Sequence, residues 1–226
     1  MTRPELDQKV HFAKDQLLLL GSMVEDAMYR SVKALKDHDL DTSQAILEND
    51  QSVNRKRFEI ESEVISVIAR QQPAAHDLRV FASVLDLCTE LERIGDYAKG
   101  IAVINLRSGG LGLPKILNDI YYMSERALDM FHRALTALIQ EDAVTARAIA
   151  QEDDIIDALY MQIYIEAIDL VTEHPNNMGR ANYVLWVAHN LERMADRVTN
   201  VCERTVFIAT GEFSEITDTL GHHVRH

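Results

Sequence analysis

VLDLCTELERIGD (residues 84–96) recurs 100 positions later as VLWVAHNLERMAD (residues 184–196), with six of the thirteen positions identical. Both segments carry apolar residues at alternating steps of three and four, which is the spacing of an amphipathic helix that buries one face. Further upstream the similarity continues at an offset of 103 residues: Ala45-Ile46, Asp50 and Ile60 correspond to Ala148-Ile149, Asp153 and Ile163. The sequence therefore predicts the internal duplication of one helical unit.

Helix-breaking residues divide each copy into three segments. We predict breaks near 37–41, 72–73, 108–114, 140–142 and 174–177, and a stop at Gly211. Six long antiparallel helices of about 25 to 35 residues remain, which indicates an all-α fold of two tandem three-helix bundles. The expected domains are a first three-helix repeat at 1–108, a glycine-rich joint at 109–113, a second three-helix repeat at 114–211 and a flexible tail at 212–226.

The helix starts also have sequence signals. Asp41 or Thr42 is suited to cap the second helix, because a short oxygen side chain can accept from the first free backbone N–H groups. Pro73, Pro114 and Pro175 are suited to first-turn positions, where the missing N–H costs nothing.

Composition restricts the possible partners. The chain has 226 residues and a formal net charge of −13, so most of its surface repels nucleic-acid phosphates and anionic lipid headgroups. No apolar run approaches the roughly 18 to 20 residues of a membrane-spanning helix, and residues 1–10 lack the apolar core of a signal peptide. We expect a cytoplasmic protein that does not insert into membranes. Cys88 and Cys202 both fall within apolar helical patterns, which favours buried, reduced thiols.

Pairs of polar side chains, spaced one helical turn apart, recur in both copies. At 100° per residue, the acidic pairs of the third and sixth helices point about 150° away from the apolar seam and are expected to face outward. The second helix of each copy has the same spacing, so antiparallel neighbours can gather up to four oxygen side chains on one patch. The candidate metal ligands are Glu92, Asp96, Asp50 and the weaker Asn54 in the first copy, and Glu192, Asp196, Asp153 and Asp157 in the second.

Carboxylates at this spacing repel one another unless a cation lies between them. Such a patch suits a hard or borderline divalent cation, or iron in a carboxylate cluster. His189 lies on the same face as Glu192 and is a weaker candidate for a nitrogen ligand, with a hydrogen-bonded bystander as the alternative. The competing interpretation of all these acids is a solvated surface with salt bridges to the arginines that follow Glu92 and Glu192.

Enzymatic motifs are scarce. Ferritin-like di-iron enzymes need Glu-x-x-His pairs that point into the bundle core, and the nearest sequence here is Asp129-x-x-His132. The sequence also lacks a phosphate-binding glycine loop, Cys-x-x-Cys, His-Glu-x-x-His and Gly-x-Ser-x-Gly. The motifs therefore favour a protein that is not an enzyme.

The segments LERIGD (91–96) and LERMAD (191–196) resemble the repeated acidic signature of the PhoU family, and QQPAAHDLR (71–79) resembles that family's opening of the third helix. This resemblance implies two three-helix bundles with multinuclear metal sites at the acidic motifs. It also implies a cytoplasmic, often dimeric regulator of phosphate homeostasis. Such a regulator acts between the ATPase of the phosphate ABC transporter and the phosphate-sensing histidine kinase, and represses the phosphate-starvation response when phosphate is plentiful.

The family's metal ligands carry over best to Glu92, Asp96, Asp153, Asp157, Glu192 and Asp196, and next to Asp50. Asn54 departs from the pattern in the first copy, and Gly100 stands where Asn200 retains the usual asparagine, a further weak candidate. Tyr97 and Arg197 occupy positions where histidine is frequent in the family.

The expected cofactors are divalent or ferric ions, with iron, zinc, manganese and magnesium all open. The leading hypothesis is a homodimeric, metal-binding negative regulator of phosphate uptake. A carboxylate-bridged metalloenzyme and a metal-free helical dimerisation scaffold stay as alternatives.

Overall fold

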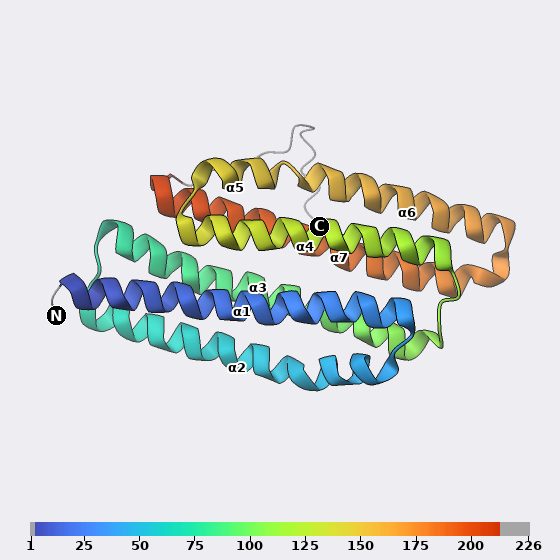
Figure 1. Ribbon diagram of the computed structural model, residues 1–226, viewed down its shortest axis with the longest axis horizontal. Helices are drawn as coiled ribbons and strands as arrows, with labels where there is room; N and C mark the ends of the chain where they lie inside the picture. The colour runs from blue at the N-terminus through green and yellow to red at the C-terminus, as the bar shows by residue number, and fades with distance from the viewer. Residues whose placement is uncertain (1–2, 213–226) are drawn as a thin grey trace.

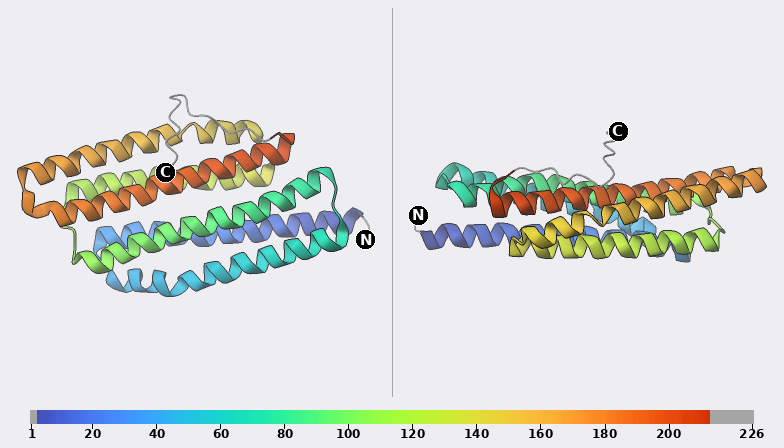
Figure 2. Two further views of the ribbon diagram at one scale, coloured as in Figure 1. Left: turned by 180° about the vertical axis from the view of Figure 1, so that it is seen from behind. Right: turned by 90° about the horizontal axis from the view of Figure 1, so that it is seen from above.

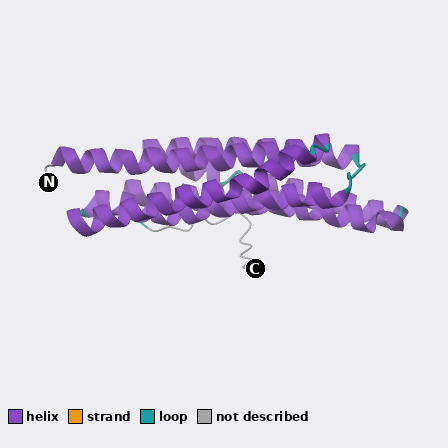
Figure 3. Ribbon diagram, turned by 90° about the horizontal axis from the view of Figure 1, so that it is seen from below, coloured by secondary structure: helices purple, strands orange, loops and turns teal. Residues whose placement is uncertain are grey.

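A computed structural model describes residues 3–212, and these residues form helices joined by short connections. Figure 3 shows most loops at the two ends of the bundle and one partway along its length. The predicted flexible tail at 212–226 lies, apart from Glu212, outside the described residues. The elements in chain order are α1 (Arg3–Asp37), α2 (Leu40–Gln71), α3 (Ala75–Ser108), α4 (Pro114–Gln140), α5 (Ala143–Ala150), α6 (Asp153–Glu173), the short 3₁₀ helix η1 (Pro175–Asn177) and α7 (Met178–Thr210).

The duplication is visible in how the helices begin. Asp39 caps α2 by accepting from Thr42 N at 2.9 Å, and Asp142 caps α5 by accepting from Thr145 N at 3.0 Å. The same Asp-x-x-Thr pattern thus satisfies free N–H groups at corresponding points of both copies. Asp39, not the predicted Asp41 or Thr42, is the α2 cap, because the helix begins earlier than expected.

Two of the three prolines predicted for first turns begin helices. Pro114 and Pro175 are the first residues of α4 and η1. Pro73 instead lies in the connection before α3, which begins at Ala75.

The two bundles lie side by side and share one continuous core. Helices α1, α2 and α3 form the first, and α4, α5–α6 and α7 form the second; α3 packs against α7 and α1 against α4. Figures 1 and 2 show α2 at one edge of the molecule and α5–α6 at the opposite edge. The predicted seams on α3 and α7 are buried, including Leu91, Ile94, Leu191 and Met194.

The fifth of the six predicted helices is interrupted. Residues Gln151 and Glu152 separate α5 from α6, whereas α2, at the corresponding place, is continuous. Arg133 of α4 holds this break by donating to both carboxylate oxygens of Glu152, at 2.8 and 2.5 Å. Because α6 starts afresh at Asp153, that predicted ligand lies at a helix N-terminus, where negative charge is favoured.

Candidate acidic metal centre

Of the acidic pairs on α3 and α7, Asp96 is exposed, whereas neighbouring helices partly cover Glu92 and Glu192. The side chains of Glu92 and Glu192 are only 20% and 24% exposed. The prediction of an outward face is therefore right for Asp96 and wrong in degree for Glu92 and Glu192, which point away from the seam but are partly buried. Partial burial makes their charges more costly than surface charges would be.

The first cluster contains its own cations. Arg57 of α2 lies with Nη1 3.3 Å from Glu92 Oε2, and Lys99 donates to Asp50 Oδ2 at 2.6 Å. Asn54 also donates to Asp50, at 3.4 Å. Burial and the neighbouring Asp96 raise the pKa of Glu92, and Arg57 opposes them. Arg57 and Lys99 thus offset part of the negative charge of this cluster.

The second cluster has a different balance. Burial raises the pKa of Glu192 to about 7, and the nearby charges of Asp196 and Asp157 add to the shift, against Arg193 and Arg197. Glu192 Oε2 is fully buried and accepts no hydrogen bond, although His189 Nδ1 lies 3.3 Å away. Leaving a buried carboxylate oxygen without a hydrogen bond costs on the order of 1–3 kcal/mol. The second cluster therefore contains an acidic acceptor whose bonding capacity the chain does not use.

The duplication explains the difference between the clusters. Arg57 corresponds to Tyr160 at the offset of 103, and Lys99 corresponds to Thr199 at the offset of 100. The Tyr160 ring lies beside His189, with their centroids 6.3 Å apart, and Thr199 donates to the backbone oxygen of Asp196 at 2.7 Å. The second cluster therefore lacks counterparts of Arg57 and Lys99; its nearby cations are Arg193 and Arg197, each 3.8 Å from Asp196.

The remaining predicted ligands are placed less centrally. Asp153, at the start of α6, is buried, and its charge acts on the pKa of Cys202. The carboxylates whose charges raise the pKa of Glu192 are Asp196 and Asp157. Asn200 donates to Glu90 of α3, in the first copy. No group of three or more His, Cys, Asp or Glu side chains within residues 3–212 converges closely enough to hold a metal ion. The structure brings candidate ligands together without forming a complete coordination sphere.

A cation fits the second cluster better than the first. The second offers hard carboxylate oxygens, one of them buried without a hydrogen bond, and an adjacent imidazole. In the first cluster, Arg57 already pairs with the carboxylate of Glu92, and Lys99 pairs with that of Asp50.

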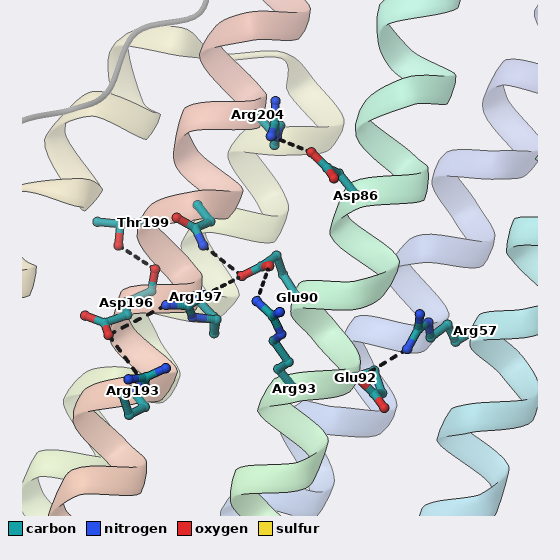
Figure 4. A network of polar contacts seen from close by, with 11 residues as sticks. Arg57, Asp86, Glu90, Glu92, Arg93, Arg193, Asp196, Arg197, Thr199 and Arg204 are labelled. Atoms are coloured by element: carbon teal, nitrogen blue, oxygen red, sulfur yellow. Dashed lines mark hydrogen bonds and ion pairs between the residues drawn. The ribbon is translucent and has the colours of Figure 1, made fainter. Parts of the chain in front are cut away.

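A polar network that the sequence did not suggest joins α3 of the first copy to the second cluster on α7. Glu90 of α3 accepts from Arg197 at 3.1 Å and from Asn200 at 2.7 Å, both on α7, and from Arg93 at 3.1 Å (Figure 4). The same Arg197 lies 3.8 Å from Asp196. Glu90 was missed because its partners come from the other copy, although an acidic side chain that faces the bundle interface is a signal that could have indicated it.

The larger cavities are not lined by the predicted carboxylate ligands. A cavity of about 700 Å³ between α1 and α2 is lined by Phe12, Lys56 and Glu63, among others, and by none of the predicted ligands. The cavity beside Asp50 and Lys99 has a volume of about 20 Å³, close to the space of one water molecule. A further hollow of about 700 Å³ along α2 is lined by Asn54 but by none of the predicted carboxylate ligands. The space beside Asp50 and Lys99 itself therefore has no room for an organic substrate.

Comparisons with known proteins agree on one similarity. The profile of the PhoU domain matches residues 17–104 and again residues 120–205. The chain is 32% identical over 219 residues to a protein of Clostridium acetobutylicum named phosphate-specific transport system accessory protein PhoU homolog, covering 96% of this chain and 100% of that one. A protein of Streptococcus pneumoniae serotype 4 with the same name is 31% identical over 216 residues, covering 95% and 99%.

Two solved structures have the same fold. The crystal structure of the phosphate transport system regulatory protein PhoU from Streptococcus pneumoniae superposes with a TM-score of 0.85 at 29% identity, covering 92% of this chain and 99% of that one. That of PhoU from Pseudomonas aeruginosa gives a TM-score of 0.86 at 29% identity, covering 91% and 99%.

Proposed function

This chain belongs to the PhoU family, and from that membership we propose that it is a non-enzymatic regulatory accessory protein of phosphate transport. In finer detail, it restrains phosphate uptake and represses phosphate-starvation signalling in the cytoplasm. It does so through contacts with the ATPase of a phosphate ABC transporter and with a sensor histidine kinase. The names of the relatives support the transport role. Within residues 3–212, no helix is both long and apolar enough to cross a membrane.

We further propose that the second acidic cluster binds a divalent or ferric ion, with iron, zinc, manganese and magnesium as candidates. The observation that carries this proposal is the buried Glu192 Oε2, which accepts no hydrogen bond where the first copy places Arg57 opposite Glu92. Glu192, Asp196 and Asp157 would supply oxygen ligands, and His189 a nitrogen. The first cluster retains Arg57 and Lys99 in place of a tightly held ion.

Regulation then depends on the charge of the surface that carries the second cluster. Glu192, Asp196 and Asp157 together repel an acidic partner, and their repulsion is long-ranged at low salt. A bound cation supplies compensating positive charge at this face. The side chains of α6 and α7 then form a surface that a regulatory partner can approach without that repulsion. The homodimer is proposed on the family resemblance alone.

The metalloenzyme alternative has less support. Catalysis on a small substrate needs a concave site that excludes water and leaves coordination positions open. The 700 Å³ cavity is lined by residues of α1, α2 and α3 and by none of the candidate ligands. A metal-free scaffold is the remaining alternative, and titration with metal ions separates it from the proposed regulator.

The metal proposal is tested by isothermal titration of Mn²⁺, Mg²⁺ and Zn²⁺ into full-length protein purified without a tag. His222, His223 and His226 are replaced by alanine throughout to remove adventitious binding by those imidazoles. Glu192→Gln/Asp196→Asn should lose the tight site, and the matched variant Glu92→Gln/Asp96→Asn should keep it. Equal titration curves for the two variants would remove the proposed site.

The regulatory proposal is tested in bacteria that lack their own PhoU protein and carry a phosphate-starvation reporter. Expression of this chain should lower the reporter signal in high phosphate, and Glu192→Gln/Asp196→Asn should not. Pull-down with the transporter ATPase and the sensor kinase, with and without chelator, separates ion-dependent from ion-independent contact. A reporter that does not respond to the chain would contradict the role in phosphate signalling.

A further inference from the structure

The outer face of α6 is apolar although it faces solvent. Met161, Ile165 and Ile168 follow one another at steps of four and three and are 52%, 55% and 44% exposed; Tyr164, beside them, is 40% exposed. A helix at the edge of a bundle usually carries polar residues on this face. A contiguous exposed apolar stripe of this kind marks an interaction site.

The first copy serves as an internal control for this stripe. Helix α2 occupies the corresponding edge of its own bundle, opposite α6 (Figure 1). The fold tolerates polar side chains there, because two of the four stripe positions are polar on α2. Tyr164 and Ile165 correspond to Glu61 and Ser62. The other two stripe positions, Met161 and Ile168, correspond to the apolar Phe58 and Ile65. On α2, however, Ser62 lies between these two residues and interrupts the stripe. The continuous stripe on α6 therefore serves something other than the fold.

Charge identifies what can cover the stripe. Helix α6 contains six acidic residues and no lysine, arginine or histidine. Lys115 of α4 pairs with Glu166 at 3.2 Å, on the side of α6 that faces α4. Asp153 is buried and Asp157 belongs to the second cluster, so the acidic residues of α6 that can border the stripe are Asp154, Glu166, Asp169 and Glu173. An apolar stripe with this acidic border is complementary to a helix whose apolar seam is flanked by lysine or arginine.

We propose that the outer face of α6, defined by Met161, Tyr164, Ile165 and Ile168, docks a basic amphipathic helix of a partner protein. A second copy of this chain is a poor occupant, because two α6 faces would bring acidic borders together, and like charges across an interface are costly. Anionic membranes are repelled for the same reason. The inference names the chemistry of a partner for the proposed regulator and so rests on that function, but its test needs no phosphate signalling.

The test uses fluorescence anisotropy with synthetic helical peptides and the full-length protein. One peptide has a leucine seam flanked by lysines. A second has the same seam flanked by glutamates, and a third has the lysine peptide's composition scrambled so that no apolar face forms. The lysine-flanked peptide should bind at least about tenfold tighter than either control. Its affinity should fall as salt is added, because charges at the border are screened.

Ile165→Ser and Ile65→Ser form the matched pair of protein variants. Both isoleucines are similarly exposed, at 55% and 57%, and lie on corresponding edge helices, so neither substitution disturbs the core. Ile165→Ser should weaken binding of the lysine-flanked peptide at least about tenfold, while Ile65→Ser should leave it within about twofold. Circular dichroism checks that both variants keep their helical content.

Four outcomes would overturn the proposal. Equal binding of the lysine- and glutamate-flanked peptides, or equal effects of the two serine variants, would show that the α6 face selects nothing. Sedimentation in which Ile165→Ser converts a dimer to a monomer would assign the face to a second copy. Absence of lysine-flanked peptide binding to the unaltered protein would reject this surface, and an intact reporter response would then leave the phosphate role in place.

Discussion

Arg57 Nη1 on α2 lies 3.3 Å from Glu92 Oε2 on α3, and Tyr160 occupies the position of the second copy that corresponds to Arg57. Arg57 also donates from Nε to Glu61 at 2.8 Å, so its guanidinium is fixed between two helices. The first copy thereby carries a permanent cation against its acidic cluster. The second copy repeats Glu92 and Asp96 as Glu192 and Asp196 and has Asp157 in place of Asn54, but the side chain that corresponds to Arg57 is the neutral Tyr160.

This asymmetry predicts that Tyr160→Arg lowers the metal affinity of the second cluster at least about tenfold, because a guanidinium there would compete with an ion for Glu192. Calorimetric titration of Mn²⁺ into the variant and the unaltered protein measures the change. Tyr160→Phe is the control, since it keeps the ring and adds no charge. An affinity unchanged in Tyr160→Arg would mean that the ion binds elsewhere.

The reciprocal exchange strengthens that test. Arg57→Tyr with Lys99→Thr removes both internal cations of the first cluster, so the carboxylates of Glu92 and Asp50 become available. We expect the titration to show one additional ion per chain. If the stoichiometry stays the same while the helical content is intact, the two cations are not what keeps the first cluster closed to metal.

Glu192 should make the metal-free protein less stable as the pH rises. Its pKa is about 7 in the folded chain against an ordinary value of 4.5, so between these values the folded state holds a proton that the unfolded state has lost. Stability therefore falls as pH rises from 4.5 through 7 and then levels off. Glu192→Gln should raise the free energy of unfolding at pH 8 by about 1–3 kcal/mol and change it little at pH 4.5.

Urea denaturation in the presence of EDTA, at pH 4.5 and pH 8, measures this difference. Glu5→Gln, on α1 and remote from both clusters, is the control. If Glu192→Gln destabilises the protein at pH 8, then Glu192 is stabilised by partners in its charged form, and the second cluster needs no cation.

Much of this fold was predictable because it depends on local periodicity and on the duplication. The seam through Leu91 and Ile94, and its counterpart through Leu191 and Met194, follows from the spacing of apolar residues. The break at Glu152 was not predictable, because it depends on Arg133 of another helix. A long-range pair of this kind leaves no periodic signal within the broken helix.

The candidate site was predictable in its residue types and not in its charge balance. Spacing alone placed Glu192 and Asp196 on one face of a helix. Whether a cation of the chain already opposes each acid depends on which side chain of α2 or α6 lies across from it. Aligning the second helices of the two copies residue by residue shows the change from Arg57 to Tyr160, but only the packing of α2 on α3 shows that Arg57 contacts Glu92.

Glu141 should stabilise the protein only while it is ionised. It accepts from Lys14 of α1 at 2.5 Å and from His76 of α3 at 2.7 Å, and so ties the end of α4 to the first copy. Burial alone would raise the pKa of Glu141, but these hydrogen bonds outweigh it and hold the pKa below 4.5. This contribution is present above pH 4.5 and is lost as the pH falls below it.

Glu141→Gln should therefore cost about 1–2 kcal/mol at pH 7 and much less at pH 3. Asp26→Asn is the matched control, since Asp26 pairs with Arg30 on an exposed surface and should cost less than about 0.5 kcal/mol at either pH. Chemical denaturation at the two pH values measures both. Equal costs at pH 7 and pH 3 would contradict the ionic role of Glu141.

Glu90→Ala should destabilise the contact between the copies by about 2–3 kcal/mol, because Arg197 and Asn200 lose a shared acceptor that is only 15% exposed. Asp86→Ala removes an acid that pairs with Arg204 across the same pair of helices but is 54% exposed, so it should cost less. Thermal unfolding measured by circular dichroism compares them. A larger loss for Asp86→Ala would show that burial does not control this interface.

Cys88 and Cys202 should both resist alkylation at pH 8, because burial raises the pKa of each thiol to about 12 and leaves almost no thiolate. The two should nevertheless differ when the protein opens locally. Cys202 lies close to Arg133, Glu152 and Asp153 at the break between α5 and α6, whereas Cys88 lies under the continuous α2, near Arg57. A broken helix opens at lower free energy than a continuous one, so Cys202 should react first in mild denaturant.

Arg133→Ala releases Glu152 and should accelerate labelling of Cys202 without affecting that of Cys88, because only the second copy depends on this pair to hold its interrupted helix. Mass spectrometry of iodoacetamide-treated protein distinguishes the two thiols. Faster labelling of Cys88, or equal acceleration of both thiols by Arg133→Ala, would mean that the chain opens as a whole. The break before Asp153 would then have no local dynamic consequence, and the second cluster would be as rigid as the first.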